Sequence, residues 1–374
     1  MKILHFGKFY PPFNGGMEIY LRDLAEQQAK TNSVTVLVHN HKFNTLVSPM
    51  IAETINQVDV IRQKTLKPVL FTPIMLGTNK IVTQLVSQDK ADIIHISWPN
   101  PSALFLLLNK AAKTKPWVIQ WQSDMVTENS SWLLKLAYKL FKPFETKLLQ
   151  QASKIIVSTE DYYNHSIALK KFQPKCEVIP LGIKPQTYKI DDTDKQWAVA
   201  KWNNAKYKIY TIGRLTFYKN HQLLLQAAEL LPNAKFIITG TGDLAATLTK
   251  LIDQKSLNNI ILTGSLRKNK LNALLSTCDA FCLPSNDRAE SYGMVLLEAL
   301  NFNKTILVSN LAGSGMRWIA SQTKLGQTFD CNDASDLVTK IKGSLHTESK
   351  VDYKPFSIEF CAKTIDSLYR DLVK

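Results

Sequence analysis

Residues 280–300 read AFCLPSNDRAESYGMVLLEAL and combine an apolar run, a polar loop and a second apolar run. Ala280–Leu283 predicts a short buried strand, and the longer run that follows Gly293 predicts a helix. Glu290 then lies at the end of the loop, and Glu298 lies inside the helix. A strand followed by a loop and a helix is the repeating unit of α/β folds.

The helical part of this stretch also predicts a binding role. Gly293 allows a ligand to approach the helix N-terminus closely, and unpaired N–H groups there favour an anion. Glu298 has mainly apolar neighbours, and a buried carboxylate is costly without hydrogen-bond donors, which ribose hydroxyl groups would supply. A solvated glutamate on a partly exposed helix is the alternative interpretation.

Short β-branched runs alternate with longer amphipathic runs along the whole chain, which is typical of parallel-sheet α/β domains. The strands predicted in the first half are Lys2–Phe6, Val34–Val38, Val58–Arg62, Ile93–Ile96, Trp117–Trp121, Lys154–Val157 and Val178–Ile179. Those predicted in the second half are Lys208–Ile212, Lys235–Thr239, Ile260–Leu262, Ala280–Leu283, Thr305–Val308 and Gln327–Phe329.

A polar stretch between these halves predicts a domain boundary. Pro180–Ile183 leads into a segment rich in lysine and aspartate that continues to about Tyr207. Apolar residues recur at helical spacing from Ile358 to Leu372, which predicts an amphipathic terminal helix. Two doubly wound halves joined by a hinge imply a cleft, and such sheets bind ligands at the carboxyl ends of their strands.

Two cations follow the first predicted strand of the second half. Arg214 and Lys219 lie in the segment GRLTFYKN (213–220), where a ligand of the cleft would bind. A pair of cations there would neutralise charge on a departing diphosphate, which a metal ion does in other enzymes. A surface cation beside a helix start is the alternative for either residue alone.

Smaller glycine motifs follow other strands. Gly15 and Gly16 precede a predicted helix after the first strand, a position that suits a phosphate, although an ordinary tight turn has the same composition. Thr239–Asp243 and Gly313–Gly315 are similar, and turn chemistry alone would explain them.

The amino-acid composition indicates which classes of binding partner are expected. The 374 residues include 46 Lys or Arg against 31 Asp or Glu, a net charge of +15. This balance favours anionic partners, but no nucleic-acid-binding signature is present, so nucleotide diphosphates and membrane surfaces rank above nucleic acid. No apolar run has the length of a membrane span, the N-terminus has no signal peptide, and the five cysteines are scattered, so we expect a cytoplasmic protein.

Together these segments resemble the retaining, GT-B-fold glycosyltransferases of family 4. The resemblance rests on the Gly15–Gly16 loop, the 213–219 segment, the pair Glu290 and Glu298 with seven residues between them, and the Gly313–Gly315 loop. Each motif is only moderately specific, whereas their order and intervals are specific in combination.

The resemblance implies an α/β fold of two Rossmann-like domains that face each other across a cleft. Residues 1–184 would form the acceptor-binding domain, and residues 185–355 would form the nucleotide-sugar donor-binding domain. The terminal helix, 356–374, would cross back to pack on the first domain.

The resemblance also implies a role for each residue that matches a family motif. Arg214 and Lys219 would hold the donor diphosphate, helped by backbone N–H groups at Gly293, Met294, Val295, Gly15 and Gly16. Glu298 would bind the ribose, Glu290 the transferred sugar, and Leu266 would lie against the base. The implied mechanism is front-face attack with retention, assisted by the leaving phosphate and without an enzyme nucleophile, so catalysis depends on positioning and charge stabilisation.

The chain departs from the family after its fifth predicted strand. Relatives often carry a histidine that touches the donor sugar, whereas this chain has Gln122 in the segment QWQSD (120–124). Glutamine still binds a sugar hydroxyl, although the sugar preference then cannot be inferred by analogy. We expect Asp124 and His95 to line the cleft, although a single histidine at a strand end is more often structural.

The sequence predicts no metal and no cofactor other than the nucleotide-sugar substrate. Asp192-Thr193-Asp194 has the spacing of a metal-binding Asp-x-Asp motif, but it lies in the polar interdomain stretch without the strand that such a site needs.

The acceptor is expected to be a glycan or a lipid-linked acceptor in cell-surface polysaccharide or glycolipid synthesis, with a hexose donor such as GDP-mannose or a UDP-hexose. The segment 132–147 mixes aromatic residues with lysines, as does the region from Arg62 to Phe71, and both are candidates for contact with an anionic membrane. Most helices of this composition are core helices with one solvated basic face. A nucleotide-sugar epimerase and a non-catalytic nucleotide-sugar-binding scaffold remain alternatives, and Gln122 favours the second.

Overall fold

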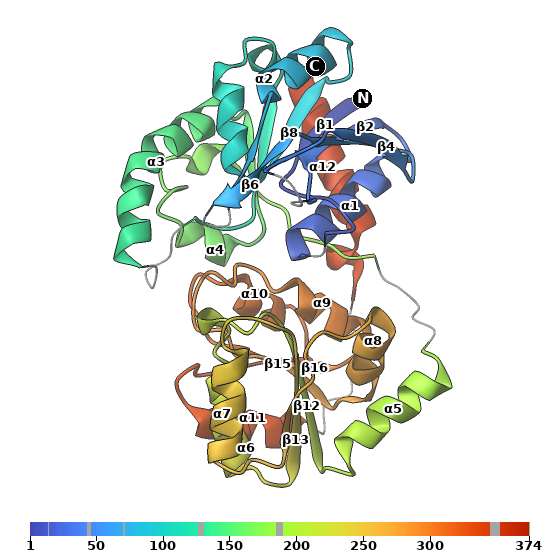
Figure 1. The fold of residues 1–374 in the computed structure, drawn as a ribbon, viewed down its shortest axis with the longest axis vertical. Helices are drawn as coiled ribbons and strands as arrows, with labels where there is room; N and C mark the ends of the chain where they lie inside the picture. The colour runs from blue at the N-terminus through green and yellow to red at the C-terminus, as the bar shows by residue number, and fades with distance from the viewer. Residues whose placement is uncertain are drawn as a thin grey trace. The chain divides into compact units, whose positions relative to one another are not determined.

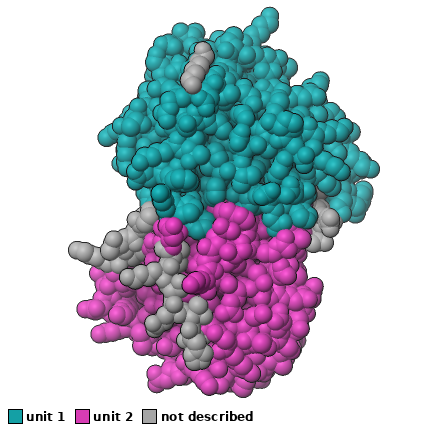
Figure 2. Space-filling view, turned by 180° about the vertical axis from the view of Figure 1, so that it is seen from behind, with its two compact units in different colours: residues 1–184, 354–374 teal, residues 185–353 magenta. Residues whose placement is uncertain are grey.

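The computed structural model describes residues 1–13, 15–42, 46–69, 72–125, 131–184, 190–344 and 352–373, and the chain divides into two compact units (Figure 1). Unit 1 comprises Met1–Lys184 and Lys354–Lys374, and unit 2 comprises Pro185–Tyr353 (Figure 2). The sequence analysis placed the return to the first domain at residue 356, two residues later than the structure does.

Unit 1 is built on an eight-stranded sheet in which only β4 is antiparallel to its neighbour. In order across the sheet the strands are β11 (Cys176–Val178), β10 (Lys154–Val157), β9 (Trp117–Trp121), β8 (Ile93–Trp98), β1 (Lys2–Phe6), β2 (Ser33–His39), β5 (Val58–Gln63) and β4 (Ile51–Ile55). The central strands are buried along their length, as is usual for parallel sheets covered on both faces. β3 (Val47–Ser48), β6 (Thr65–Val69) and β7 (Thr72–Met75) form a small antiparallel sheet.

The helices of unit 1 are α1 (Gly16–Gln28), α2 (Thr78–Ser87), α3 (Trp132–Gln151), α4 (Glu160–Asn164) and α12 (Ile358–Val373), with short 3₁₀ segments that include η1 (Pro101–Leu108). α12 packs beside α1 (Figure 1), and Gln28 of α1 donates a hydrogen bond to Asp366 of α12 at 2.6 Å. The expectation of a terminal helix that returns to the first domain is therefore confirmed.

Unit 2 is built on a six-stranded parallel sheet. Its order is β14 (Ile260–Leu262), β13 (Ala234–Thr239), β12 (Tyr207–Ile212), β15 (Ala280–Leu283), β16 (Thr305–Ser309) and β17 (Gly326–Phe329). Its helices are α5 (Asp192–Trp202), α6 (His221–Leu230), α7 (Ala245–Gln254), α8 (Lys268–Thr277), α9 (Met294–Asn301), α10 (Gly315–Ser321) and α11 (Ala334–Ser344). The strand order reverses direction between β12 and β15, so the loops that follow these two strands flank the topological switch point.

The predicted strands are all present, with bounds that differ by at most two residues at either end, but some elements were not predicted. β4 carries mostly exposed residues and lies at a sheet edge, so it lacks the apolar signal of a central strand. The polar stretch before Tyr207 contains helix α5, which buries only Ala198 and Trp202. Asp192 and Asp194 lie in its first turn, where carboxylates favour the helix N-terminus, so this Asp-x-Asp motif belongs to a helix.

Candidate functional site

Three loops meet at the switch point of unit 2. They follow the strands β12, β15 and β16, which are neighbours in the sheet. The backbone N–H of Asn286 donates to the carbonyl of Tyr218 at 3.0 Å, which joins the first loop to the second. The hydroxyl of Ser314 donates to the carbonyl of Glu290 at 2.6 Å, which joins the second loop to the third. The backbone around Glu290 is therefore held from both sides.

Lys219 and Glu290 form an ion pair across this switch point. The side chains are 10% and 12% exposed, so the pair is nearly buried. Lys219 lies against Gly213, where an added Cβ would be 3.2 Å from the lysine Cε. Ser285 also contacts Glu290, with its hydroxyl 3.4 Å from Oε2. The sequence analysis selected both charged residues, and the fold brings them together although 71 positions separate them (290 − 219).

Arg214 lies on the same loop as Lys219 but is exposed. Its Nη2 is 3.4 Å from the hydroxyl of Tyr218, and the ammonium group of Lys219 is 5.6 Å from the centre of the Tyr218 ring. Tyr218 thus contacts both predicted diphosphate ligands. The sequence analysis did not select it, although its place between Arg214 and Lys219 in the chain was a usable signal.

In unit 2, glycines also allow the backbones of neighbouring loops to pack in direct contact. Gly240 follows β13 with φ +152°, and a Cβ there would overlap the carbonyl of Gly213. A Cβ on Gly242 would lie 2.7 Å from the backbone nitrogen of Leu215. The N–H of Gly240 donates to the carbonyl of Gly264 at 3.0 Å, which adds the loop after β14. The glycines of Thr239–Asp243 therefore serve close packing, beyond the turn chemistry that the sequence suggested.

The helix α9 begins directly after Gly293, where the sequence analysis placed its N-terminus. Gly293 precedes the helix with φ +83°, a conformation that favours glycine. The first turn has no acidic residue, and Met294 and Val295 are partly exposed. Leu266 is partly buried in the loop between β14 and α8.

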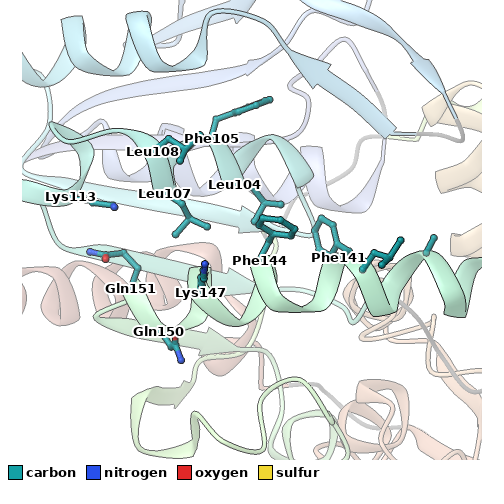
Figure 3. Close-up of a pocket in the computed structure, with 12 residues that line it drawn as sticks. Leu104, Phe105, Leu107, Leu108, Lys113, Phe141, Phe144, Lys147, Gln150 and Gln151 are labelled. Carbon is teal, nitrogen blue, oxygen red and sulfur yellow. The ribbon is translucent and has the colours of Figure 1, made fainter.

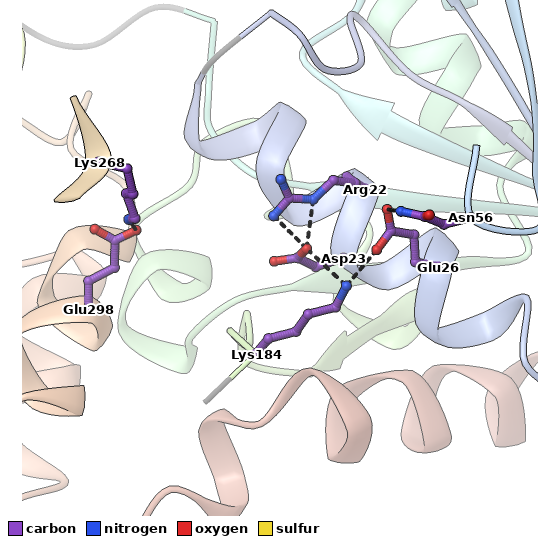
Figure 4. A network of polar contacts seen from close by, with 7 residues as sticks. All are labelled: Arg22, Asp23, Glu26, Asn56, Lys184, Lys268 and Glu298. Carbon is purple, nitrogen blue, oxygen red and sulfur yellow. Dashed lines mark hydrogen bonds and ion pairs between the residues drawn. The ribbon is translucent and has the colours of Figure 1, made fainter. Parts of the chain in front are cut away.

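The structure agrees with the alternative interpretation of Glu298, a glutamate on a partly exposed helix face. Its side chain is 26% exposed, and Oε1 accepts from the ammonium group of Lys268 at 3.0 Å (Figure 4). α9 buries Leu296, Leu297, Ala299 and Leu300, and Glu298 lies on the remaining face. The ammonium group of Lys268 therefore satisfies this carboxylate.

In unit 1 a carboxylate lies against the glycine loop that precedes α1. Gly15 precedes α1 with extended backbone at φ −158°, and a Cβ on it would overlap the carboxylate of Glu18. Glu18 is 7% exposed and lies in the first turn of the helix that begins at Gly16. The positive end of α1 therefore already has an anionic neighbour, which the sequence analysis did not consider.

Gln122 follows β9 and has an unsatisfied amide. Its backbone N–H donates to the carbonyl of Trp98 at 3.0 Å, and its side chain is turned inward, with the residue 4% exposed. Neither Oε1 nor Nε2 has a hydrogen-bond partner among the described residues. A buried amide without partners costs free energy, so this position fits a group completed by a ligand.

Asp124 is engaged by its surroundings. Its Oδ1 accepts from the indole of Trp121 at 2.9 Å and from the hydroxyl of Ser166 at 2.7 Å. Its backbone N–H donates to the hydroxyl of Tyr162 at 2.6 Å. These contacts fix the path of the chain after Gln122, so Asp124 positions this loop.

The placement of His95 at a strand end in a cleft is wrong. His95 lies in the middle of β8, is 1% exposed, and its Nδ1 is hydrogen-bonded to the hydroxyl of Tyr369 in α12. Its ring centre is 4.8 Å from that of His5. Burial holds the pKa of His95 well below its ordinary value, so the ring is neutral. It is a core residue that joins the sheet to α12.

The sequence analysis did not select Glu145, a second buried carboxyl group of unit 1. Glu145 of α3 is 1% exposed, accepts a hydrogen bond from the hydroxyl of Tyr138, and has an Oε2 without a partner in the described ranges. Burial raises its pKa to about 7. The residues around Glu145 in the sequence do not indicate that it is buried, because its burial depends on how α3 packs.

Arg62 does not belong to a surface patch. It is 3% exposed, its Nε donates to Glu53 at 2.6 Å, and its Nη1 donates to the carbonyl of Tyr10 at 3.1 Å. It also donates to the carbonyl of Pro11 at 2.5 Å and so holds the loop after β1. Leu70 and Phe71 of the proposed patch lie outside the described residues.

The end of the first segment of unit 1 is anchored to α1 (Figure 4). Lys184 contacts Glu26 at 2.5 Å and Asp23 at 3.5 Å. Arg22 contacts Asp23 at 2.7 Å, and the amide of Asn56 donates to Glu26 at 2.9 Å. This network fixes the position of the last residue before the chain enters unit 2.

The described residues contain neither a cluster suited to a metal ion nor a helix suited to crossing a membrane. No group of three or more His, Cys, Asp or Glu side chains in the described ranges is arranged to hold a metal ion, and the five cysteines are free thiols. Among the helices of those ranges, none combines the length and the apolar character that crossing a membrane requires.

Comparison with known proteins agrees with this architecture. The family described as "Glycosyltransferase Family 4" matches residues 14–187, and "Glycosyl transferases group 1" matches residues 192–354. The chain is 28% identical to O-antigen chain mannosyltransferase C of Escherichia coli, covering 90% of this chain and 87% of that protein. It is 24% identical to the D-rhamnosyltransferase WbpZ of Pseudomonas aeruginosa, covering 85% and 80%.

A solved structure shows the same fold over the whole length. The catalytic domain of starch synthase IV from Arabidopsis thaliana, bound to ADP and acarbose, is similar with a TM-score of 0.74 and 14% identity, covering 99% of each chain. The two family matches fall on the two units, each with its own doubly wound sheet. The chain therefore belongs to the family 4 glycosyltransferases and has the GT-B fold.

Proposed function

We propose that this glycosyltransferase moves a hexose, with retention, from GDP-mannose or a UDP-hexose to a glycan or a lipid-linked acceptor. The observation that carries the proposal is the Lys219–Glu290 ion pair at the switch point of unit 2. Ligands of open α/β sheets bind at the carboxyl ends of the strands at such a point. A nucleotide sugar has both the diphosphate that Lys219 would bind and the sugar hydroxyls that Glu290 would bind.

The surroundings of this pair suit a diphosphate. Arg214 is exposed and lies on the same loop, and the N-terminus of α9 presents Met294 and Val295 without an acidic residue in its first turn. Cations and helix N-termini stabilise negative charge that develops on a leaving phosphate. When the diphosphate binds, Lys219 would exchange part of its contact with Glu290 for the phosphate oxygens.

Gln122 would bind a sugar hydroxyl. Its amide has a donor and an acceptor without partners in the part of the chain that the structure describes, and both are buried. A hydroxyl satisfies both groups at once, because it accepts and donates. Gln122 is thus compatible with an active enzyme, since a glutamine at this position keeps groups that can bind a sugar hydroxyl.

We propose that transfer needs no metal ion. Lys219 and Arg214 would provide the positive charge that a divalent cation provides in metal-dependent transferases. The named relatives transfer mannose and D-rhamnose. They favour mannose or a related deoxyhexose as the sugar, and an acceptor in cell-surface polysaccharide synthesis. We propose that the enzyme works at the cytoplasmic face of the membrane.

Thermal stabilisation by nucleotides tests the donor site first. Purified protein is titrated with GDP, UDP, ADP and their sugars, with and without EDTA, and the shift in Tm is measured. We expect one base to stabilise the protein in EDTA, because binding raises stability in proportion to ln(1 + [L]/Kd). A shift that requires a divalent metal would contradict metal-free binding.

Product analysis then tests transfer itself. With the selected donor and a lipid-linked acceptor extract, NMR of the new linkage reports whether the anomeric configuration is retained. An inverted product would contradict the proposed mechanism. Turnover of the donor to its epimer without an acceptor would establish the epimerase alternative instead.

A further inference from the structure

Cations lie near aromatic side chains in both units, but the two places differ in how the charges meet the rings. In unit 1, the groove between α3 and η1 has Lys113 and Lys147 at one end, and Phe141 lies toward the other end (Figure 3). In unit 2, the loop after β12 carries two cations that both contact one aromatic residue, Tyr218. The second arrangement lets an aromatic side chain stabilise and orient positive charge.

Tyr218 meets the two cations with different parts of its side chain. The ammonium group of Lys219 lies over the ring, 5.6 Å from its centre, which is within the range of a cation–π interaction. Nη2 of Arg214 donates to the Tyr218 hydroxyl at 3.4 Å. One uncharged residue therefore contacts both of the cations that would bind the donor diphosphate.

The backbone of Tyr218 is held in place by a neighbouring loop. Tyr218 lies in the short 3₁₀ segment η4 (Phe217–Lys219), and its carbonyl accepts from the backbone N–H of Asn286 at 3.0 Å. Asn286 belongs to the loop that also carries Glu290, the partner of Lys219 in the ion pair. The start of the Tyr218 side chain is therefore fixed relative to the ion pair, as positioning of a neighbouring group requires.

Contact with Tyr218 affects the two cations in different ways. Arg214 is exposed, and a long side chain in water loses rotamer freedom when it binds a ligand. A contact that restricts the side chain before the ligand arrives removes part of this cost. Lys219 is nearly buried, and the electron-rich face of the ring stabilises a charge that has little water around it.

We propose that Tyr218 is a positioning residue for the donor diphosphate. Its hydroxyl orients Arg214 and its ring stabilises Lys219, so both cations are prepared before the diphosphate binds. The inference rests on the proposed function, because it takes these two cations as the diphosphate ligands. It adds to the site a residue that acts on the diphosphate through its neighbours.

Affinity for a nucleoside diphosphate tests the proposal. The probe is GDP, UDP or ADP, whichever raises the Tm of the wild type, and calorimetric titration of the full-length protein gives its Kd. Tyr218→Leu removes the ring and the hydroxyl, and we expect the Kd to rise about tenfold, because a cation–π contact and a hydrogen bond from a charged group are lost.

Phe217→Leu is the matched control for this variant. Phe217 is the neighbouring aromatic residue of the same turn, is 60% exposed, and packs edge-on against Tyr218 with the ring centres 5.8 Å apart. We expect its Kd to change by less than about twofold, as is usual for a surface substitution. Equal losses in the two variants, or an unchanged Kd in Tyr218→Leu, would overturn the proposal.

Tyr218→Phe separates positioning from a structural role. It keeps the ring beside Lys219 and removes only the hydroxyl, so it should recover part of the affinity that Tyr218→Leu loses, and it remains informative if Tyr218→Leu does not fold. We expect a Kd about threefold above that of the wild type. In the Arg214→Ala background the same change should have no further effect, because the partner of the hydroxyl is already absent. Additive losses would overturn the proposed orientation of Arg214.

The same titrations distinguish failure of this inference from failure of the proposed function. A wild-type protein that binds none of the three nucleotides would refute the donor site, and the positioning role with it. Nucleotide binding that is equally tight in the wild type, Tyr218→Leu and Tyr218→Phe would leave the donor site standing and refute only the role of Tyr218.

Discussion

Buried polar groups are satisfied differently at the Lys219–Glu290 pair of unit 2 and at Gln122 and Glu145 of unit 1. In unit 2 the Lys219–Glu290 pair is neutralised internally, and the surrounding loops are joined by backbone hydrogen bonds and closely packed glycines. In unit 1 the buried amide of Gln122 and one oxygen of the buried Glu145 have no partner among the described residues. A satisfied network is rigid without a ligand, whereas an unsatisfied one gains free energy when a ligand arrives.

The two arrangements suit two kinds of recognition, binding of the diphosphate in unit 2 and discrimination among sugars near Gln122 in unit 1. GDP-mannose and the UDP-hexoses share a diphosphate, and a preformed cation with a fixed backbone is enough to bind it. A particular sugar is distinguished by its hydroxyls, and a buried polar group that lacks a partner discriminates strongly against ligands that cannot satisfy it. We therefore expect changes in unit 2 to affect binding of every donor, and changes near Gln122 to affect the choice of sugar.

The largest effect is expected from Lys219→Ala. It removes the cation of the diphosphate site and leaves Glu290 as a nearly buried carboxylate without its partner. We expect kcat/KM to fall by about 10²–10³, the usual cost of losing a group that stabilises a leaving charge. Steady-state kinetics measure it. Lys268→Ala is the control, since it breaks the more exposed pair with Glu298 and should cost less than about 1 kcal/mol of stability. Similar losses of kcat/KM in Lys219→Ala and Lys268→Ala would show that the Lys219–Glu290 pair has no special role in transfer.

The pH dependence of stability tests whether the buried carboxyl group of Glu145 in unit 1 has a raised pKa. Burial raises the pKa of Glu145 from 4.5 to about 7, which corresponds to about 3 kcal/mol. Between these values the unfolded carboxyl ionises while the folded one stays protonated, so the wild type loses stability as pH rises from 4.5 to 7. Above pH 7 the loss is complete. We expect Glu145→Gln to match wild type near pH 4.5 and to be about 2–3 kcal/mol more stable at pH 8, by urea unfolding. A constant difference across this range would contradict the raised pKa.

Gly240→Ala tests the close packing in unit 2. Gly240 has φ +152°, and an added Cβ would overlap the carbonyl of Gly213, so backbone must move. We expect a loss of about 2–3 kcal/mol in the free energy of unfolding, with weaker donor binding. Gly343→Ala is the matched control, because a Cβ there meets nothing within 4 Å and the residue lies in α11, where alanine is favoured over glycine. An unchanged Tm in Gly240→Ala would show that these loops are not tightly packed.

The smallest effect on stability is expected from Gln122→Leu. Removing a buried amide that has no partner should leave stability unchanged or raise it by about 1 kcal/mol, while transfer should fall at least tenfold. Gln120→Leu is the matched control, since its amide is also buried without a partner but lies inside β9. We expect it to preserve activity. Equal activity of the two variants would show that Gln122 binds no sugar.

Much of the fold could be predicted from the sequence because central parallel strands are apolar along their whole length. β1, β9, β10, β14 and β15 have the bounds that the apolar runs predicted. β4 and α5 could not be predicted in this way. β4 has exposed residues at a sheet edge, and α5 buries two residues of eleven, so neither carries a strong periodic signal.

The candidate site was predictable in its residue types and only partly in its contacts. Lys219 and Glu290 follow strands that were recognised, and parallel strands end at the same edge of a sheet, so their proximity follows from the topology. Nothing in the sequence around Glu298 pointed to Lys268, which comes from a different helix. His95 was misplaced because its environment depends on α12, which joins the sheet from the far end of the chain.

Local composition and spacing were enough to predict the strand–loop–helix units, their division into two halves, and the charged residues after β12 and β15. The tertiary structure alone decided which polar groups are satisfied. Glu298 acquired a lysine, Gln122 kept a buried amide without a partner in the described residues, and Glu145 became a buried acid with a raised pKa. The reason is physical: desolvation and hydrogen bonding depend on neighbours that packing brings from distant parts of the chain, which no local pattern records.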